Sequence, residues 1–142
     1  MKRVISGLGL VAVFAAGFLA RGVVPAEPVA FAQGARVFEL RTYVVPDSAK
    51  LDLLHNRFRT QTGRFFQRHG MTQVWYGKVQ DQPGSQTTMI YMLAHANREA
   101  AKKSWDAFRA DQEWAAVAKE SGVGPVKIEA VYMDPTDYSP LK

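Results

Sequence analysis

The residues of this chain best suited to chemistry are a histidine and a tyrosine in two segments with strand character. His95 ends the segment 87–95, and Tyr43 lies in the segment 36–45. An imidazole can exchange a proton near neutral pH, and a phenol can orient a polar group. We therefore take His95 and Tyr43 as candidate catalytic residues. No serine motif of the G-x-S-x-G kind and no cysteine accompanies them, so covalent nucleophilic chemistry has no support.

The alternation of side chains along these segments places further polar and aromatic residues beside the candidates. Successive side chains of a strand point to opposite faces, so Glu39 and Arg41 share the face of Tyr43. On that face Arg41 would hold an anionic group and the tyrosines would orient the bound molecule. The expected ligand-binding set is Glu39, Arg41, Tyr43, Trp75, Tyr91 and His95. A structural role is the alternative, because a buried charge must be paired and Glu39 lies beside Arg41.

The histidines do not have the spacing of a metal site. His55, His69 and His95 lie far apart in sequence, whereas metal-binding histidines commonly sit one helical turn apart. We predict no metal ligands and no cofactor. His69 follows a helical pattern, and we expect it to interact with the end of that helix.

Four strands and two helices must position these residues. Alternating or branched residues predict strands over 36–45, 71–79, 87–95 and 126–133, and apolar residues at helical spacing predict helices over 49–69 and 97–119. The order β-α-β-β-α-β predicts an α+β fold of the ferredoxin-like kind, a four-stranded antiparallel sheet with both helices on one face. On the first helix, Arg57, Arg64 and Arg68 recur at helical spacing, which predicts one solvated basic stripe.

The other face of this sheet is left without helices, and the expected ligand-binding set is assigned to it. An aromatic face of this kind is seldom bare in water. We expect a second copy of the chain to cover it, so that two sheets form a dimeric α/β barrel with a lumen.

The first 32 residues differ from the rest. Lys2 and Arg3 precede an uncharged run over 4–20, which is typical of a secretory signal. Small residues up to Ala32 suit cleavage there. This predicts a signal peptide over 1–32 and an exported domain over 33–142, periplasmic or extracellular. The uncharged run is near the shortest length that spans a bilayer, so an uncleaved membrane anchor through residues 4–20 stays open.

The charge balance excludes one class of partner. The formal net charge is +5, a mild excess, whereas a nucleic-acid binder usually concentrates far more positive charge on one face. We expect no nucleic-acid partner, and a membrane contact only if the N-terminal segment stays uncleaved.

Four motifs together resemble the NIPSNAP family. They are FELRTY (38–43), RF-x(10)-HGM (57–71), NREAA-x-x-SW-x-AF (97–108) and PTDYSP (135–140). The resemblance covers 37–140 and implies the dimeric α/β-barrel fold. Two departures stand out. Gln112 replaces a proline common in the family, so a softer helix break is expected there, and Trp75-Tyr76-Gly77 replaces a Gly-aromatic-Trp order.

The resemblance implies a fold more firmly than a function. Our prediction is an exported NIPSNAP-like homodimer whose lumen binds a small, partly apolar molecule. Because the wider superfamily includes cofactor-free monooxygenases and small isomerases, one alternative is an enzyme of that kind. The other is a non-catalytic protein-interaction module. The sequence leaves open whether the protein is an enzyme.

Overall fold

The computed structural model describes residues 36–142, so the predicted signal segment 1–32 lies outside the described residues. The elements are β1 (Val37–Val44), α1 (Ser48–Arg57), the π-helical turn η1 (Phe58–Thr62), α2 (Gly63–Arg68), β2 (Thr72–Lys78), the 3-10 turn η2 (Gly84–Gln86), β3 (Thr88–His95), α3 (Arg98–Ala110), α4 (Gln112–Glu120) and β4 (Lys127–Met133). Within 36–142, no helix has both the length and the apolar character needed to cross a bilayer.

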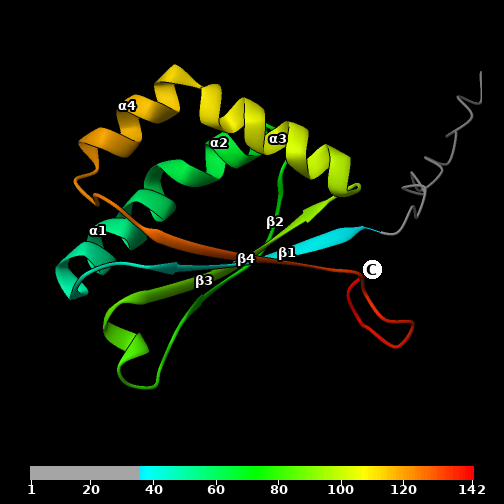
Figure 1. Ribbon diagram of the computed structural model, residues 1–142, viewed down its shortest axis with the longest axis horizontal. Helices are drawn as coiled ribbons and strands as arrows, with labels where there is room; N and C mark the ends of the chain where they lie inside the picture. The colour runs from blue at the N-terminus through cyan, green and yellow to red at the C-terminus, as the bar shows by residue number, and fades with distance from the viewer. Residues whose placement is uncertain (1–35) are drawn as a thin grey trace, which may run out of the picture. The chain divides into compact units, whose positions relative to one another are not determined.

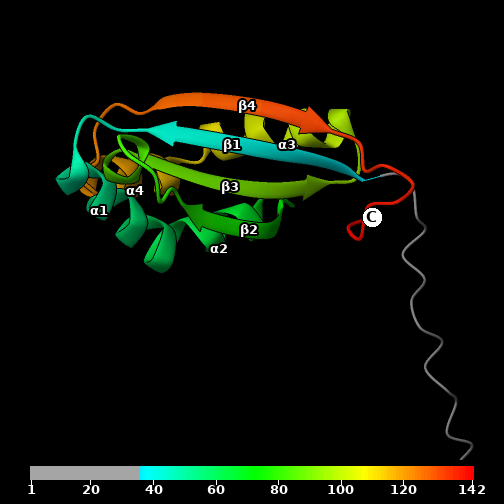
Figure 2. The same cartoon turned by 90° about the horizontal axis from the view of Figure 1, so that it is seen from below.

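The four strands form one antiparallel sheet in the order β2-β3-β1-β4. All helices lie on one side of it (Figure 1), and Figure 2 looks onto the strands with the helices behind them. The predicted ferredoxin-like β-α-β-β-α-β order is therefore confirmed. Each predicted helix is divided, the first by the π turn η1 and the second at Asp111.

Side-chain caps explain where the helices begin. The carboxylate of Asp47 accepts a hydrogen bond from the Lys50 amide, and Asn97 does the same for Ala100, as expected for these residue types. Asp111 has extended backbone angles and caps α4 by accepting from the amides of Glu113 and Trp114. The helix break thus persists without the family's proline, because a capping carboxylate starts the next helix.

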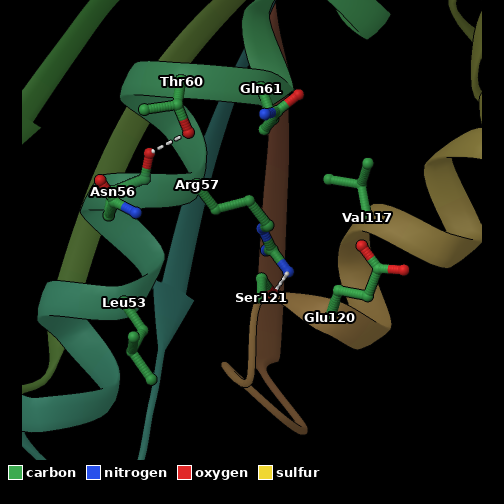
Figure 3. A pocket seen from close by; sticks show the side chains of 8 residues that line it. All are labelled: Leu53, Asn56, Arg57, Thr60, Gln61, Val117, Glu120 and Ser121. Carbon is green, nitrogen blue, oxygen red and sulfur yellow. Dashed lines mark hydrogen bonds between the residues drawn. The ribbon is translucent and has the colours of Figure 1, made fainter.

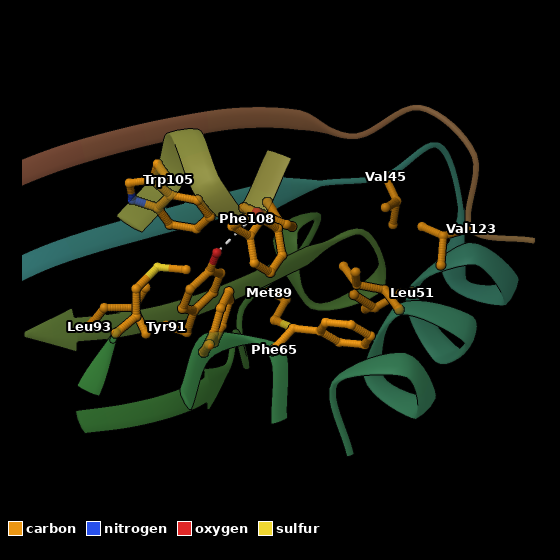
Figure 4. Close-up of a cluster of buried hydrophobic side chains, with 13 residues drawn as sticks. Val45, Leu51, Phe65, Met89, Tyr91, Leu93, Trp105, Phe108 and Val123 are labelled. Atoms are coloured by element: carbon orange, nitrogen blue, oxygen red, sulfur yellow. Dashed lines mark hydrogen bonds between the residues drawn. The ribbon is translucent and has the colours of Figure 1, made fainter. Parts of the chain in front are cut away.

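Aromatic side chains fill the space between the helices and the sheet (Figure 4). The ring of Tyr91 stacks on Phe66 at 5.8 Å between centroids, and Phe108 contacts Trp105 at 5.3 Å. Full burial of a side chain of this size stabilises the fold by roughly 2–3 kcal/mol. The apolar positions of the second predicted helix therefore belong to the core.

The structure corrects the face to which the ligand-binding set was assigned. Arg41 lies opposite Tyr91 in the β1–β3 pairing, so both side chains leave the sheet on the same side. That side is the helix-covered one, since Trp105 of α3 donates a hydrogen bond to Glu39. The assignment to the uncovered face, and so to a lumen between two sheets, is wrong for Glu39, Arg41, Tyr43, Tyr91 and His95. The alternation of side chains shows which residues share a face of the strand. It does not show which face the helices cover, because both faces of β1 carry apolar side chains.

Trp75 is the exception, and a β-bulge separates it from the rest of the set. The register shifts between Gln73 and Trp75, so Gln73 lies opposite Leu93 and Trp75 opposite Met92. Residues two apart in a regular strand share a face, and the extra residue of a bulge reverses this relation. Trp75 therefore lies on the uncovered side, where the residue is 51% exposed.

The uncovered side of the sheet is itself apolar. We call it the uncovered sheet face, and it includes Leu40, Trp75, Ile90, Met92 and Val131. Val131 is 57% exposed. The expectation that a second copy covers this face thus keeps its physical basis, but with a different set of residues.

Candidate functional site

Glu39 stands at the centre of a buried polar cluster. Its side chain is fully buried, and its two carboxylate oxygens accept three hydrogen bonds. Arg41 Nη1 donates to Oε1 at 2.6 Å, while His95 Nε2 and Trp105 Nε1 reach Oε2 at 2.8 and 2.7 Å. A buried carboxylate is stable only with such partners, and the predicted pairing of Glu39 with Arg41 is confirmed.

Three elements bring these groups together. Glu39 and Arg41 are alternate residues of β1, and His95 ends the neighbouring strand β3. Trp105 comes from α3, where Ala101, Trp105 and Phe108 are buried at helical spacing against the sheet. The amphipathic pattern of α3 therefore aims the indole N–H at the carboxylate.

The hydrogen bonds fix the ionisation of Glu39. Burial by itself raises the pKa of this carboxyl, but the hydrogen bonds from His95, Trp105 and Arg41 outweigh burial and lower the pKa to about 2. Glu39 is therefore a permanent anion near neutral pH, and its partner His95 carries a proton on Nε2. The Nδ1 atom of His95 is buried without a hydrogen-bond partner among residues 36–142.

Arg41 is held by its charge and by two aromatic rings. Its guanidinium lies 4.0 Å from the centroid of the Trp105 ring and 5.6 Å from that of Tyr43. Burial acts to lower the pKa of Arg41, but Tyr91, Tyr43 and the Glu39 carboxylate together raise it above its ordinary value. Arg41 thus keeps its charge inside the protein.

The two tyrosines of the predicted set belong to the core. The Tyr91 hydroxyl donates to the Tyr43 hydroxyl at 3.0 Å, and both residues are buried. Burial raises the pKa of Tyr91 well above its ordinary value. The Tyr91 phenol therefore stays protonated near neutral pH and keeps its hydrogen bond to Tyr43.

A cleft of ≈ 530 Å³ opens between α3 and β4, beside the buried cluster. The residues that line it are Glu39, Arg41, Arg98, Glu99, Lys102, Trp105, Arg109, Ala130 and Tyr132. From the predicted ligand-binding set, only Glu39 and Arg41 reach it, and neither the two tyrosines nor His95 line it. We name it the α3–β4 cleft.

The sequence prediction missed the cationic side chains that α3 contributes to the cleft. Arg98, Lys102, Trp105 and Arg109 follow one another at intervals of four, three and four residues, which places them on one helix face. That spacing was the signal in the sequence for a cationic helix face. It did not lead to a predicted site, because charges on a helix that packs on a sheet are usually solvated.

The α3–β4 cleft combines positive charge with an aromatic wall. Four of its residues are cationic and two are acidic, and the carboxylate of Glu39 is already paired with Arg41. The guanidinium of Arg98 lies 3.4 Å from the centroid of the Tyr132 ring. Such a surface suits an anion with an apolar part. Within 36–142, no cluster of three or more His, Cys, Asp or Glu residues could hold a metal ion.

The NIPSNAP family model matches residues 38–140. This chain belongs to the NIPSNAP family. A NIPSNAP family protein from Agrobacterium tumefaciens is 21% identical with a TM-score of 0.64, and the match covers 75% of this chain and 99% of that one. A second from the same organism, described as having unknown function, is 17% identical with a TM-score of 0.66 over 77% and 96% of the two chains.

A more distant match also shares the fold of this NIPSNAP chain. It is a dimeric ferredoxin-like protein from an uncultured marine organism, 14% identical with a TM-score of 0.52 over 70% and 93% of the two chains. At such identities the likeness concerns the fold alone. No curated protein matches the chain.

Proposed function

We propose that this NIPSNAP protein binds a small, partly apolar anion in the α3–β4 cleft. The observation that carries the proposal is the excess of cationic side chains there. Once the Glu39–Arg41 pair is set aside, Arg98, Lys102 and Arg109 remain in the lining against the single carboxylate of Glu99. Asp106, outside the lining, bonds to both Lys102 and Arg109, so one positive charge is left in excess. Trp105 and Tyr132 offer the apolar contact. Binding is favoured over catalysis, because His95 and Tyr43 lie outside the cleft lining. The monooxygenase or isomerase and the interaction module stay predictions.

The binding test uses octanoate, with octanol as its uncharged counterpart, on the protein purified from its own host. We expect octanoate to raise the melting temperature and octanol to leave it nearly unchanged. Replacing Arg98 and Lys102 together by glutamine should remove most of the octanoate effect. Lys103→Gln is the matched control, since Lys103 is exposed on the same helix and does not line the cleft. Equal octanoate effects in the double variant and in the wild type would contradict the proposal.

Self-association is part of the proposal, and the apolar side chains of the uncovered sheet face support it. Such a face is seldom left in water, and a second copy offers a matching surface. We expect a dimer in sedimentation velocity and a shift to monomer in Trp75→Glu and Val131→Glu. Tyr138→Glu is the control, because Tyr138 is an exposed aromatic residue in the tail after β4. A wild-type monomer, or dimers in both face variants, would contradict this part.

Export is the remaining part of the proposal. The basic start and the uncharged run over 4–20 support it. Mass determination of the protein recovered from the host compartments tests it. A chain that begins near Gln33 outside the cytoplasm agrees with a cleaved signal, and a full-length membrane-bound chain agrees with the anchor.

A further inference from the structure

A second groove, which shares no lining residue with the α3–β4 cleft, contains an unbalanced charge. It measures ≈ 220 Å³ and lies between α1 with η1 and α4 (Figure 3). Its lining residues are Leu53, Asn56, Arg57, Thr60, Gln61, Val117, Glu120 and Ser121. We name it the α1–α4 groove. In Figure 3 the side chain of Arg57 extends from α1 toward Ser121.

Arg57 is buried without an anionic partner in the part of the chain that the structure describes. Only 8% of the residue is exposed. Its Nη1 donates to Ser121 Oγ over a long 3.4 Å, and its Nε is buried without any partner among residues 36–142. Glu120 lines the same groove, yet no ion pair within 36–142 joins it to Arg57. A buried charge left in this way is costly.

One aromatic ring offsets part of this cost. The guanidinium of Arg57 lies 5.2 Å from the centroid of the Trp114 ring, a distance at which a cation–π contact is attractive. Burial lowers the pKa of Arg57, the direction expected for a cation that still lacks a counter-charge.

Arg57 continues the buried face of α1 after Leu51 and Leu54, and the π turn that follows explains why Arg64 does not share this face. The predicted basic stripe is wrong for Arg57, because Arg64 is 51% exposed at its side chain and bonded to Glu113, while Arg57 is buried. Between them η1 adds a residue to the helical turn, which rotates α2 relative to α1. The hydroxyl of Thr62 donates to the carbonyl of Arg57 at 3.2 Å inside this turn. π turns of this kind occur frequently at functional sites.

We infer that the α1–α4 groove binds the carboxylate of a small monoanion on Arg57. A planar guanidinium matches a carboxylate with two parallel hydrogen bonds. Ser121 lies beside that position, Asn56 and Gln61 add polar side chains to the same lining, and Leu53 and Val117 offer contact to a short apolar chain.

Glu120 sets the charge of the ligand. Its carboxylate lines the groove, so a second negative charge on the ligand would be repelled. A monovalent carboxylate therefore fits better than a phosphate dianion. This site is separate from the α3–β4 cleft and does not depend on the function proposed for it.

The test is calorimetric titration of the purified protein with propionate, at constant ionic strength set by chloride. We expect Arg57→Gln to weaken propionate binding at least tenfold. Arg64→Gln is the matched control, since Arg64 lies on the following helix and is exposed, and it should bind like the wild type. Equal losses in the two variants would overturn the inference, because they would indicate a general charge effect.

Glu120→Gln gives a second test, which does not depend on whether Arg57→Gln folds. It should tighten propionate binding several-fold and should allow inorganic phosphate to bind. Unchanged propionate affinity in Glu120→Gln would overturn the inference. Propionate binding that is lost in the Arg98→Gln, Lys102→Gln double variant but kept in Arg57→Gln would place propionate in the α3–β4 cleft and would overturn the inference.

Discussion

Arg41 of β1 and Arg57 of α1 are two largely buried arginines, and each lies against a tryptophan. Arg41 is 4.0 Å from the Trp105 ring centroid and 2.6 Å from the carboxylate of Glu39. Arg57 is 5.2 Å from the Trp114 ring centroid, and its nearest polar partner is a hydroxyl at 3.4 Å. The difference is the counter-charge. Within residues 36–142, Glu39 supplies one to Arg41, and no ion pair supplies one to Arg57.

This difference separates a structural charge from one able to receive a ligand. The pKa of Arg41 is raised above its ordinary value by its neighbours, although burial opposes this, and burial lowers that of Arg57. A cation already balanced by the protein gains little from an added anion, whereas an unbalanced one gains a partner. Removing either arginine, or the carboxylate of Glu39, tests this difference.

The largest effect is expected from Glu39→Gln. The substitution leaves Arg41 buried without its counter-charge, so the free energy of unfolding should fall by about 3 kcal/mol. Urea unfolding near pH 7 measures it. Glu113→Gln is the control, because Glu113 pairs with Arg64 and Arg68 on the surface and such pairs contribute less than about 1 kcal/mol. Equal changes in the two variants would show that Glu39 is not the required partner of Arg41.

Arg41→Met should destabilise the fold by a smaller amount, about 2 kcal/mol. Glu39 then loses one of its three donors but keeps those of His95 and Trp105. The methionine still packs on the tryptophan, so the loss reports the charge pair rather than the contact area. An Arg41→Met protein as stable as the wild type in urea would remove the distinction between the two arginines.

Stability should also depend on acid pH through Glu39. Its pKa is about 2 in the folded protein and about 4.5 when it is free of these contacts. The carboxylate form therefore contributes stability that is fully present above pH 4.5 and is lost as the pH falls toward 2. Asp111, held to a pKa of about 2 chiefly by the hydrogen bond from His69, adds to the same trend. Urea midpoints between pH 7 and pH 3 should fall less steeply in Glu39→Gln than in the wild type, and parallel curves would contradict this.

The smallest effect is expected from Thr62→Val, which acts on the arginine that lacks a counter-charge. It removes the hydroxyl that donates to the Arg57 carbonyl in the π turn, and about 1 kcal/mol of unfolding free energy should be lost. Thr60→Val is matched, because Thr60 makes a similar bond to Asn56 at an exposed position and should cost less. A larger loss in Thr60→Val would mean that the π turn does not depend on Thr62.

The order of the helices and strands was predictable from the periodicity of the sequence. The caps at Asp47 and Asn97 were predictable from their residue types. The pairing of Glu39 with Arg41 was also predictable, because adjacent positions on one strand face leave few other partners. Which face of the sheet the helices cover was not predictable, since both faces of β1 have apolar side chains. Two local irregularities, a β-bulge and a π turn, could not be predicted from the periodicity of the sequence. The bulge at Gln73 and the π turn after Arg57 each shift the phase on which pattern arguments rely.

The α3–β4 cleft could be predicted only in part from the sequence. Arg98, Lys102 and Arg109 of its lining come from α3, while its other wall comes from β4, which lies later in the chain. A spacing argument on one helix can find the cationic face. It cannot show that Tyr132 and Ala130 stand opposite that face, because this depends on how far α3 extends over the edge strand.

The most direct measurement is the unfolding free energy of the wild type and of Arg57→Met, with and without propionate, at one protein concentration. Without propionate, the variant should be at least as stable as the wild type, because it loses an unbalanced buried charge. With saturating propionate, the wild type should become the more stable of the two, since the ligand binds only its folded state. A variant that is less stable than the wild type by the same amount in both conditions would contradict the account, because Arg57 would then be a structural charge like Arg41.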